Sequence, residues 1–169
     1  MATVRVVTQS LDNFSQDTIY MDTMIPYALL RAIDPAVKPF FQKLEAGEFQ
    51  AFTSALTFDE LAYRLLLGLI KDNYPGSPLD HLRDNETKLI AEFASTVTEQ
   101  LEHLRNFPHL IVLDVLASDL TNMFEAMVQY QLRPRDALHV ATMERIVCYD
   151  LASTDQHFDH IPHIRRFSL

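Results

Sequence analysis

The sequence predicts a three-layer α/β/α domain with a central parallel sheet. Short apolar runs, such as the LIVL run at 110–113, alternate with longer segments whose apolar residues recur at helical spacing. Strands that alternate with helices favour parallel pairing through right-handed crossovers. A chain of 169 residues has the length of one domain. We therefore expect a single domain over 1–169, with residues 1–17 as an N-terminal extension.

Five apolar runs are predicted to be strands, and a weaker run at 4–7 is a further candidate. In chain order the five runs are 18–21, 49–54, 110–113, 151–153 and 164–167. They are short and apolar, the first of them β-branched, as expected for buried strands. Helical segments separate the first four runs, which is the arrangement expected for one parallel sheet.

Six segments are predicted to be helices. In chain order they are 25–33, 35–44, 57–71, 79–105, 118–130 and 134–147. Thr57 begins the third, Ser118 suits the N-cap of the fifth, and Pro134 suits the first turn of the last. The loop cluster PGSP at 75–78 separates the third from the fourth. The fourth carries a long apolar stripe, in which we include Ile90.

Composition excludes several classes of protein. The three glycines are too dispersed for a GxGxxG or Walker A loop, so nucleotide binding on a glycine-rich loop is not expected. The single Cys148 rules out a disulfide framework and a multi-cysteine metal site. The longest apolar run, at 65–70, is far shorter than the roughly twenty residues of a membrane span. Without a signal-peptide pattern at its N-terminus, the chain is expected to be cytoplasmic, with no membrane contact.

The charge balance constrains how this protein can meet a nucleic acid. It has 14 basic and 23 acidic residues, and a net charge of −9 with histidine neutral. Such a chain repels a polyanion as a whole. If it acts on RNA or DNA, acidic charge must be cancelled locally, and a divalent cation is the obvious candidate.

Four acidic residues fall at equivalent places on this predicted map. Asp22 and Asp155 each follow an apolar run, whereas Glu60 and Asp136 lie at the starts of predicted helices. The C-terminal ends of parallel strands and the following helix N-termini share one edge of the sheet, where ligands bind. Four carboxylates that meet there suit a hard cation bound by oxygen. Zinc is disfavoured because neither cysteines nor a suitably spaced histidine pair is available.

Each acid also has a purely structural interpretation. Thr57 and Glu60 match a capping box, Asp136 is a candidate N-cap, and Asp155 is a candidate turn residue. Acids near helix N-termini are favoured by the helix dipole in any case. Taken singly, these structural roles are the more common ones. Acids that only cap helices or turns, however, need not lie at the same edge of the sheet. The placement of all four acids at one edge therefore favours a functional site.

The segments around the four acids resemble the PIN domain, a family of metal-dependent nucleases. They read YMDTMIPYALL, SALTFDELAYRL, RPRDALHVATM and LASTDQHFDHIPHI, and their order and spacing agree with the family. The likeness extends from Thr18 to Phe167, and within the family the chain resembles the VapC-like toxins of toxin–antitoxin pairs. The resemblance implies a PIN-like fold, Mg²⁺ or Mn²⁺ as cofactor, and cleavage that leaves a 5′-phosphate and a 3′-hydroxyl.

The resemblance also implies roles for matching positions. Asp22, Asp136 and Asp155 would hold Mg²⁺ or Mn²⁺, directly or through water, and Glu60 would complete the shell. Ser153 matches a small hydroxyl residue that supports the site in the family.

Other polar residues near the four acids are candidates for supporting roles. Arg133 and Arg135 flank Pro134 and either contact substrate phosphate or pair with nearby acids. Arg64 is expected to form an ion pair with the acid four residues before it. His139 lies in an apolar run and is expected in the core or behind the site. His157 stands where many relatives carry Asp, and either contacts substrate or is a surface residue.

Three functions are consistent with these residues. The preferred one is a metal-dependent endoribonuclease that acts as a toxin, with an RNA substrate, an antitoxin partner and a homodimeric assembly. A housekeeping nuclease that matures ribosomal or other RNA is the second. A non-catalytic PIN-like scaffold is the third, and only Met24 favours it, because many relatives carry Asn or Ser there and a thioether donates no hydrogen bond. A dehalogenase-type phosphatase would need an Asp at position 24, where this chain has Met. A receiver domain that is phosphorylated at Asp114 would need paired acids beside the first strand, which this chain lacks.

Overall fold

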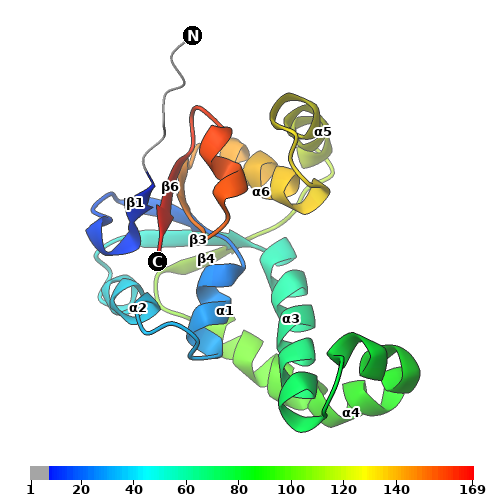
Figure 1. Ribbon diagram of the computed structural model, residues 1–169. Helices are drawn as coiled ribbons and strands as arrows, with labels where there is room; N and C mark the ends of the chain where they lie inside the picture. The colour runs from blue at the N-terminus through cyan, green and yellow to red at the C-terminus, as the bar shows by residue number, and fades with distance from the viewer. Residues whose placement is uncertain (1–7) are drawn as a thin grey trace.

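The alternating strands and helices form one parallel sheet covered on both faces, as the sequence predicts (Figure 1). The computed structural model describes residues 8–169. The strands are β1 (Gln9–Ser10), β2 (Thr18–Met21), β3 (Gln50–Ser54), β4 (Leu110–Leu113), β5 (Asp150–Ala152) and β6 (Arg165–Ser168). They pair in the order β1-β6-β5-β2-β3-β4, and every pair is parallel.

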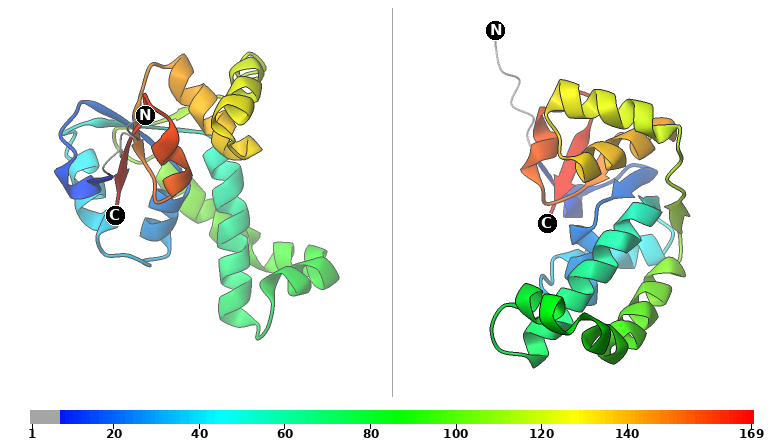
Figure 2. Two further views of the ribbon diagram at one scale, coloured as in Figure 1. Left: turned by 45° about the horizontal axis from the view of Figure 1, so that its top comes forward. Right: turned by 90° about the vertical axis from the view of Figure 1, so that its right-hand side faces the viewer.

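Helices flank the sheet in two layers. They are α1 (Met24–Leu30), α2 (Val37–Glu45), α3 (Ala55–Asn73), α4 (Pro78–Arg105), α5 (Asp119–Tyr130) and α6 (Pro134–Arg145), with the 3-10 helices η1 (Leu11–Asn13) and η2 (Gln156–His160). Helices α1 and α2 lie on one side of the sheet, and α5 and α6 lie on the other (Figure 1). Helices α3 and α4 pack against each other and extend away from the sheet (Figure 2).

Each layer has its own apolar core because successive residues of a strand face opposite sides of the sheet. On β2, Ile19 belongs to the cluster under α1 and α2, whereas Tyr20 belongs to the cluster under α5 and α6. A third, smaller cluster of Ile70, Leu89 and Phe93 joins α3 to α4 where they leave the sheet. Within residues 8–169, no helix is both long and apolar enough to cross a membrane.

The strand order places a crevice beside β2. After β2 the chain moves outward through β3 to β4, and it then returns to β5 on the opposite side of β2. Connections that leave two neighbouring strands in opposite directions open a crevice at their carboxyl ends, and ligands bind there. Asp22 directly follows β2, and Asp155 lies three residues after Ala152, the last residue of β5. The fold therefore brings two of the predicted site residues to this crevice.

Two predicted helices, those at 57–71 and 79–105, differ from the observed ones. Helix α3 begins at Ala55, with Ser54 as N-cap, so Thr57 lies inside the helix. Its hydroxyl accepts a hydrogen bond from Thr53 at 2.8 Å in the buried interior. Helix α4 was predicted to be continuous, but Asn85 has non-helical dihedral angles, φ −138° and ψ 33°, and kinks it.

Other boundaries shift by up to three residues, and the prediction for Ile90 is wrong. Ile90 is 42% exposed, because the buried line of α4 runs through Leu89, Phe93 and Val97 at a spacing of four residues. Ser118 is the N-cap of α5, as predicted, but its side chain makes no capping bond; Asp119 accepts a hydrogen bond from the Leu116 backbone N–H at 2.9 Å. The candidate strand at 4–7 lies outside the described residues.

Candidate active site

A cavity of about 440 Å³ opens at the carboxyl edge of the sheet. All four acids singled out in the sequence, Asp22, Glu60, Asp136 and Asp155, line this cavity. They come from the end of β2, from α3, from α6 and from the turn after β5. The topology thus gathers carboxylates from four distant segments in one place.

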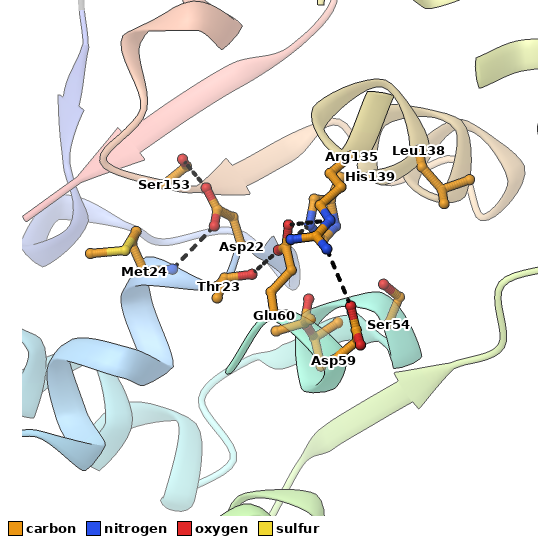
Figure 3. A network of polar contacts seen from close by, with 12 residues as sticks. Asp22, Thr23, Met24, Ser54, Asp59, Glu60, Arg135, Leu138, His139 and Ser153 are labelled. Carbon is orange, nitrogen blue, oxygen red and sulfur yellow. Dashed lines mark hydrogen bonds and ion pairs between the residues drawn. The ribbon is translucent and has the colours of Figure 1, made fainter. Parts of the chain in front are cut away.

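Asp22 is buried and is held at both of its carboxylate oxygens (Figure 3). The Ser153 hydroxyl donates a short hydrogen bond to Oδ2. The backbone N–H of Met24 donates to Oδ1 at 3.1 Å. Met24 therefore supports the site through its main chain, which does not depend on its thioether. Each carboxylate oxygen keeps a free lone pair, because an ionised carboxylate has about four acceptor positions.

Glu60 is oriented by three residues from outside its own helix. The Thr23 hydroxyl donates a short hydrogen bond to Oε2, and His139 Nε2 lies 3.2 Å from the same oxygen. The Arg135 Nε lies 3.8 Å from Oε1. Burial alone would raise the pKa of Glu60, but the bonds from His139 and Thr23 and the Arg135 charge outweigh it and lower this pKa.

The expected capping box is absent from α3. Glu60 is the sixth residue of the helix, past its first turn, because α3 begins at Ala55 and not at Thr57. The N-cap is Ser54, and its side chain makes no capping bond. Since the partners of Glu60 are Thr23, His139 and Arg135, the carboxylate faces the cavity and α6.

A buried polar chain continues behind Glu60. His139 Nδ1 lies 2.8 Å from the Tyr20 hydroxyl, which in turn bonds to Ser54 Oγ at 2.9 Å. All three residues are buried. The expectation for His139 stands as a position behind the site, whereas Tyr20, Thr23 and Ser54 were missed. The available signal was a tyrosine in a central strand, since a buried tyrosine hydroxyl requires a polar partner.

Asp136 is the third residue of α6 and differs from the other acids. The N-cap position belongs to Arg133, so Asp136 is not the N-cap. Burial raises the pKa of Asp136, and the negative charges of Asp155, Asp22 and Glu60 raise it further. Among residues 8–169, no group donates a hydrogen bond to this carboxylate, whereas donors hold each of the other three acids. Its ionised form is therefore the least stabilised of the four.

Asp155 combines a structural role with its place in the cavity. It is the N-cap of η2, and its Oδ1 accepts from the His157 backbone N–H at 2.9 Å and lies 2.7 Å from His157 Nδ1. Burial acts to raise the pKa of Asp155, but the contacts with His157 outweigh it and lower this pKa. His157 itself is 59% exposed and lines a neighbouring shallow depression.

The arginines at the cavity differ from one another. Arg135 lies between Asp59, at 3.6 Å, and Glu60, at 3.8 Å, so it pairs with acids of α3 (Figure 3). Arg64 lines the cavity, but the expected ion pair with Glu60 is not formed within the described chain, because Glu60 faces α6 and meets Arg135. Arg133 is exposed, lines the cavity, and has no acidic partner within 4.0 Å among residues 8–169.

The carboxylate oxygens of the cavity suit a hard divalent cation. Carboxylate oxygens are the ligands that Mg²⁺ and Mn²⁺ prefer. Burial and the negative charges of its neighbours both raise the pKa of Asp136, and a cation would relieve the second of these effects. No three His, Cys, Asp or Glu side chains in residues 8–169 have the spacing of a formed metal site.

Comparison with known proteins identifies the fold and the family. The fold matches VapBC2 from Rickettsia felis, solved with a promoter DNA fragment, with a TM-score of 0.61, 12% identity and coverage of 89% of this chain and 98% of that one. A toxin–antitoxin complex from Klebsiella pneumoniae matches at 0.50, with 17% identity over 86% and 94% of the two chains. VapC20 from Mycobacterium tuberculosis, a sarcin–ricin loop cleaving toxin, matches at 0.50, with 15% identity over 79% and 86%. A comparison with curated protein sequences gave no match. The family model of the PIN domain matches residues 19–164, and the chain belongs to the PIN domain family.

Proposed function

We propose that this protein is an endoribonuclease that uses Mg²⁺ or Mn²⁺ to hydrolyse phosphodiester bonds in RNA. The observation that carries this proposal is the meeting of four carboxylates in one cavity, where burial and the charges of the other three acids raise the pKa of Asp136. Membership of the PIN domain family supports it. A cluster of this kind would be costly to keep for packing alone, since like charges destabilise one another.

The residues of the cavity would have different roles in such a reaction. Asp22, Asp136 and Asp155 would hold the cation, directly or through water, and Glu60 would complete the shell. When bound, the cation would neutralise phosphate charge and activate a water for attack on phosphorus. Ser153 fixes the direction of Asp22. Thr23 and His139 do the same for Glu60.

Arg133 is the cavity residue best suited to meet the RNA backbone. Its guanidinium is exposed at the cavity and has no acidic partner within 4.0 Å in the described chain, whereas Arg135 is engaged with Asp59 and Glu60. Arginine matches phosphate geometry through paired N–H groups. His157 lies farther out, on the depression next to Asp155, and serves the same substrate only at its edge.

The biological setting included in this proposal is that of a toxin held by an antitoxin. Its support is the likeness of fold to VapBC2 and to the toxin–antitoxin complex from Klebsiella pneumoniae. Co-expression with the product of an adjacent small gene tests it. A stable complex that suppresses cleavage is the expected result, whereas unchanged cleavage would favour the RNA-maturation role.

The proposed assembly is a homodimer that meets at α5. Leu120, Phe124 and Val128 are all exposed at a spacing of four residues on α5, which forms one apolar ridge, and the exposed Leu116 precedes the helix. Such ridges pack into the grooves of a second helix. The exposed face of α5 carries only Glu125 as a charged residue, so two copies with a net charge of −9 each repel least there. Phe124→Asp should convert the dimer to a monomer in light scattering, and a wild-type monomer would contradict this assembly.

The central test is RNA cleavage under controlled metal supply. Structured and single-stranded RNA are incubated with the protein in Mn²⁺ and in EDTA. Cleavage is expected in Mn²⁺ alone and should be lost in Asp22→Asn. Asp114→Asn is the matched control, because Asp114 also follows a strand, β4, but does not line the cavity. Equal cleavage in EDTA or in Asp22→Asn would refute the proposal, and the absence of both cleavage and Mn²⁺ binding would favour a scaffold.

A further inference from the structure

Arg166, the second residue of β6, is a permanent charge placed in the interior. Its side chain is 3% exposed. Buried charges persist only when they are paired and hydrogen-bonded. The guanidinium makes a two-pronged ion pair with Asp159 in η2, with Nε 2.6 Å from Oδ1 and Nη2 2.9 Å from Oδ2. Nη2 also donates to the Thr8 hydroxyl at 2.8 Å.

One further contact links this ion pair to the candidate active site. Arg166 Nη1 donates to the backbone carbonyl of Ser153 at 3.0 Å. The N–H of Ser153 donates to the Phe167 carbonyl, also at 3.0 Å. Its hydroxyl donates to Asp22 and accepts from the Asp155 N–H at 3.0 Å. All the polar atoms of Ser153 are therefore engaged, and strand β6 holds two of them.

Asp159 fixes the other end of the same turn. Asp155 caps η2, and Asp159 lies within η2. Arg166 thus binds the turn at residue 153 and at residue 159, with Asp155 between the two points. The planar fork of a guanidinium sets the distance and angle between groups that it binds, whereas a lysine ammonium is a single flexible point charge.

We infer that Arg166 and Asp159 are positioning residues for the cation proposed above. Neither lines the cavity. They act through Ser153 and through the turn that carries Asp155, and so set how two of the four carboxylates meet. The inference rests on the proposed function in one respect, namely that Asp22 and Asp155 hold a divalent cation. Residues that orient metal ligands from behind typically change metal affinity by about 10- to 100-fold.

The test compares two neighbouring arginines of β6. Arg166→Lys keeps the charge and removes the fork. Arg165→Lys is the matched control, since Arg165 makes an equivalent two-pronged pair with Asp150, at 2.6 and 2.8 Å, at the opposite end of β5 from Ser153. Mn²⁺ affinity is measured on the full chain by isothermal titration calorimetry, without RNA. Melting curves in EDTA establish that each variant is folded.

Arg166→Lys is expected to bind Mn²⁺ about tenfold more weakly, and Arg165→Lys to stay within about twofold. Electron paramagnetic resonance at saturating Mn²⁺ should show a changed spectrum for Arg166→Lys only, because a loss of stability alone does not alter ligand geometry. Asp159→Asn is the second variant if Arg166→Lys does not fold. Asp159 is partly exposed, so this change is better tolerated, and it should weaken Mn²⁺ binding several-fold.

The results that overturn the inference are distinct from those that overturn the proposed function. A folded Arg166→Lys or Asp159→Asn that binds Mn²⁺ like the wild type would overturn the inference alone. An equal loss of Mn²⁺ affinity in Arg165→Lys would also overturn the inference, since it would show that a change of either arginine in β6 weakens Mn²⁺ binding. A wild-type chain that binds no Mn²⁺ would overturn the proposed function, and with it any positioning of that cation.

Discussion

Removal of the Tyr20 hydroxyl should destabilise the protein far more than the loss of one atom suggests. Tyr20 is fully buried on β2, and its hydroxyl lies 2.9 Å from Ser54 Oγ and 2.8 Å from His139 Nδ1. In Tyr20→Phe the ring still fits, but two buried polar groups lose a partner. Each such group costs about 1–3 kcal/mol, so the free energy of unfolding should fall by about 2–6 kcal/mol. For a chain of this length the melting temperature should then fall by about 5–25 °C.

The assay is urea unfolding in EDTA, with Ser54→Ala and the double variant completing a thermodynamic cycle. The double variant should lose less stability than the sum of the single variants, because one unpaired group has been removed, with a coupling of about 1 kcal/mol. Burial raises the pKa of the Tyr20 phenol, so the effect should be the same at pH 7 and pH 9. A loss below about 0.5 kcal/mol, the lower range for a single hydrogen bond, or strict additivity would refute this reasoning.

Three further outcomes are expected at the cavity. Because the folded-state pKa of Asp136 is raised, its ionised form destabilises the fold increasingly as the pH rises through that pKa. Asp136→Asn should therefore abolish RNA cleavage while keeping or raising the melting temperature in EDTA at pH 7. The pKa of Glu60 is lowered from 4.5, so its stabilisation is present above that value and is lost as the pH falls through the folded-state pKa. Glu60→Gln should flatten the acid side of the stability–pH profile measured by urea unfolding. Arg133→Ala should weaken RNA binding in Ca²⁺ and lower its log–log salt slope by about one unit, with Mn²⁺ affinity unchanged. An unchanged slope would show that RNA enters by another route.

Local sequence patterns located the elements that bury an apolar face. The boundaries of β2 and β4 agree with prediction because their apolar runs end abruptly in polar residues. Strand β1 could not be found, since two residues carry no periodicity and this strand exists only through its pairing with β6. The start of α3 was misplaced because two hydroxyl residues compete for the cap. Thr57 lies in the buried interior, where it accepts a hydrogen bond from Thr53 four residues earlier, and Ser54 takes the N-cap.

The site was predictable to the level of its acids and no further. Each acid follows a strand or lies near the start of a helix, and parallel topology alone brings such places to one edge. The residues that orient the acids are reached only through tertiary contacts. Thr23 sits in a helix start far from Glu60 in sequence, and Arg166 lies outside every motif that carried the family resemblance. The i, i+4 spacing favoured Arg64 as the partner of Glu60, but the side chain turns to α6 and meets Arg135.

The distribution of charge around the cavity implies an order of binding. Hydrogen-bond donors already stabilise the ionised forms of Glu60 and Asp155, whereas burial and neighbouring acids raise the pKa of Asp136, an effect that His139 offsets only in part. An approaching phosphate meets that same negative charge, and Arg133 at the rim offsets only part of it. In the proposed function, a cation bound first would remove the repulsion for the phosphate as well as for the carboxylates. Because linkage between two ligands is reciprocal, the proposed nuclease would bind RNA more tightly once the cation is present, and the cation more tightly once RNA is present. A net charge of −9 is then no obstacle to a nucleic-acid substrate, since the field that matters is the one at the cavity.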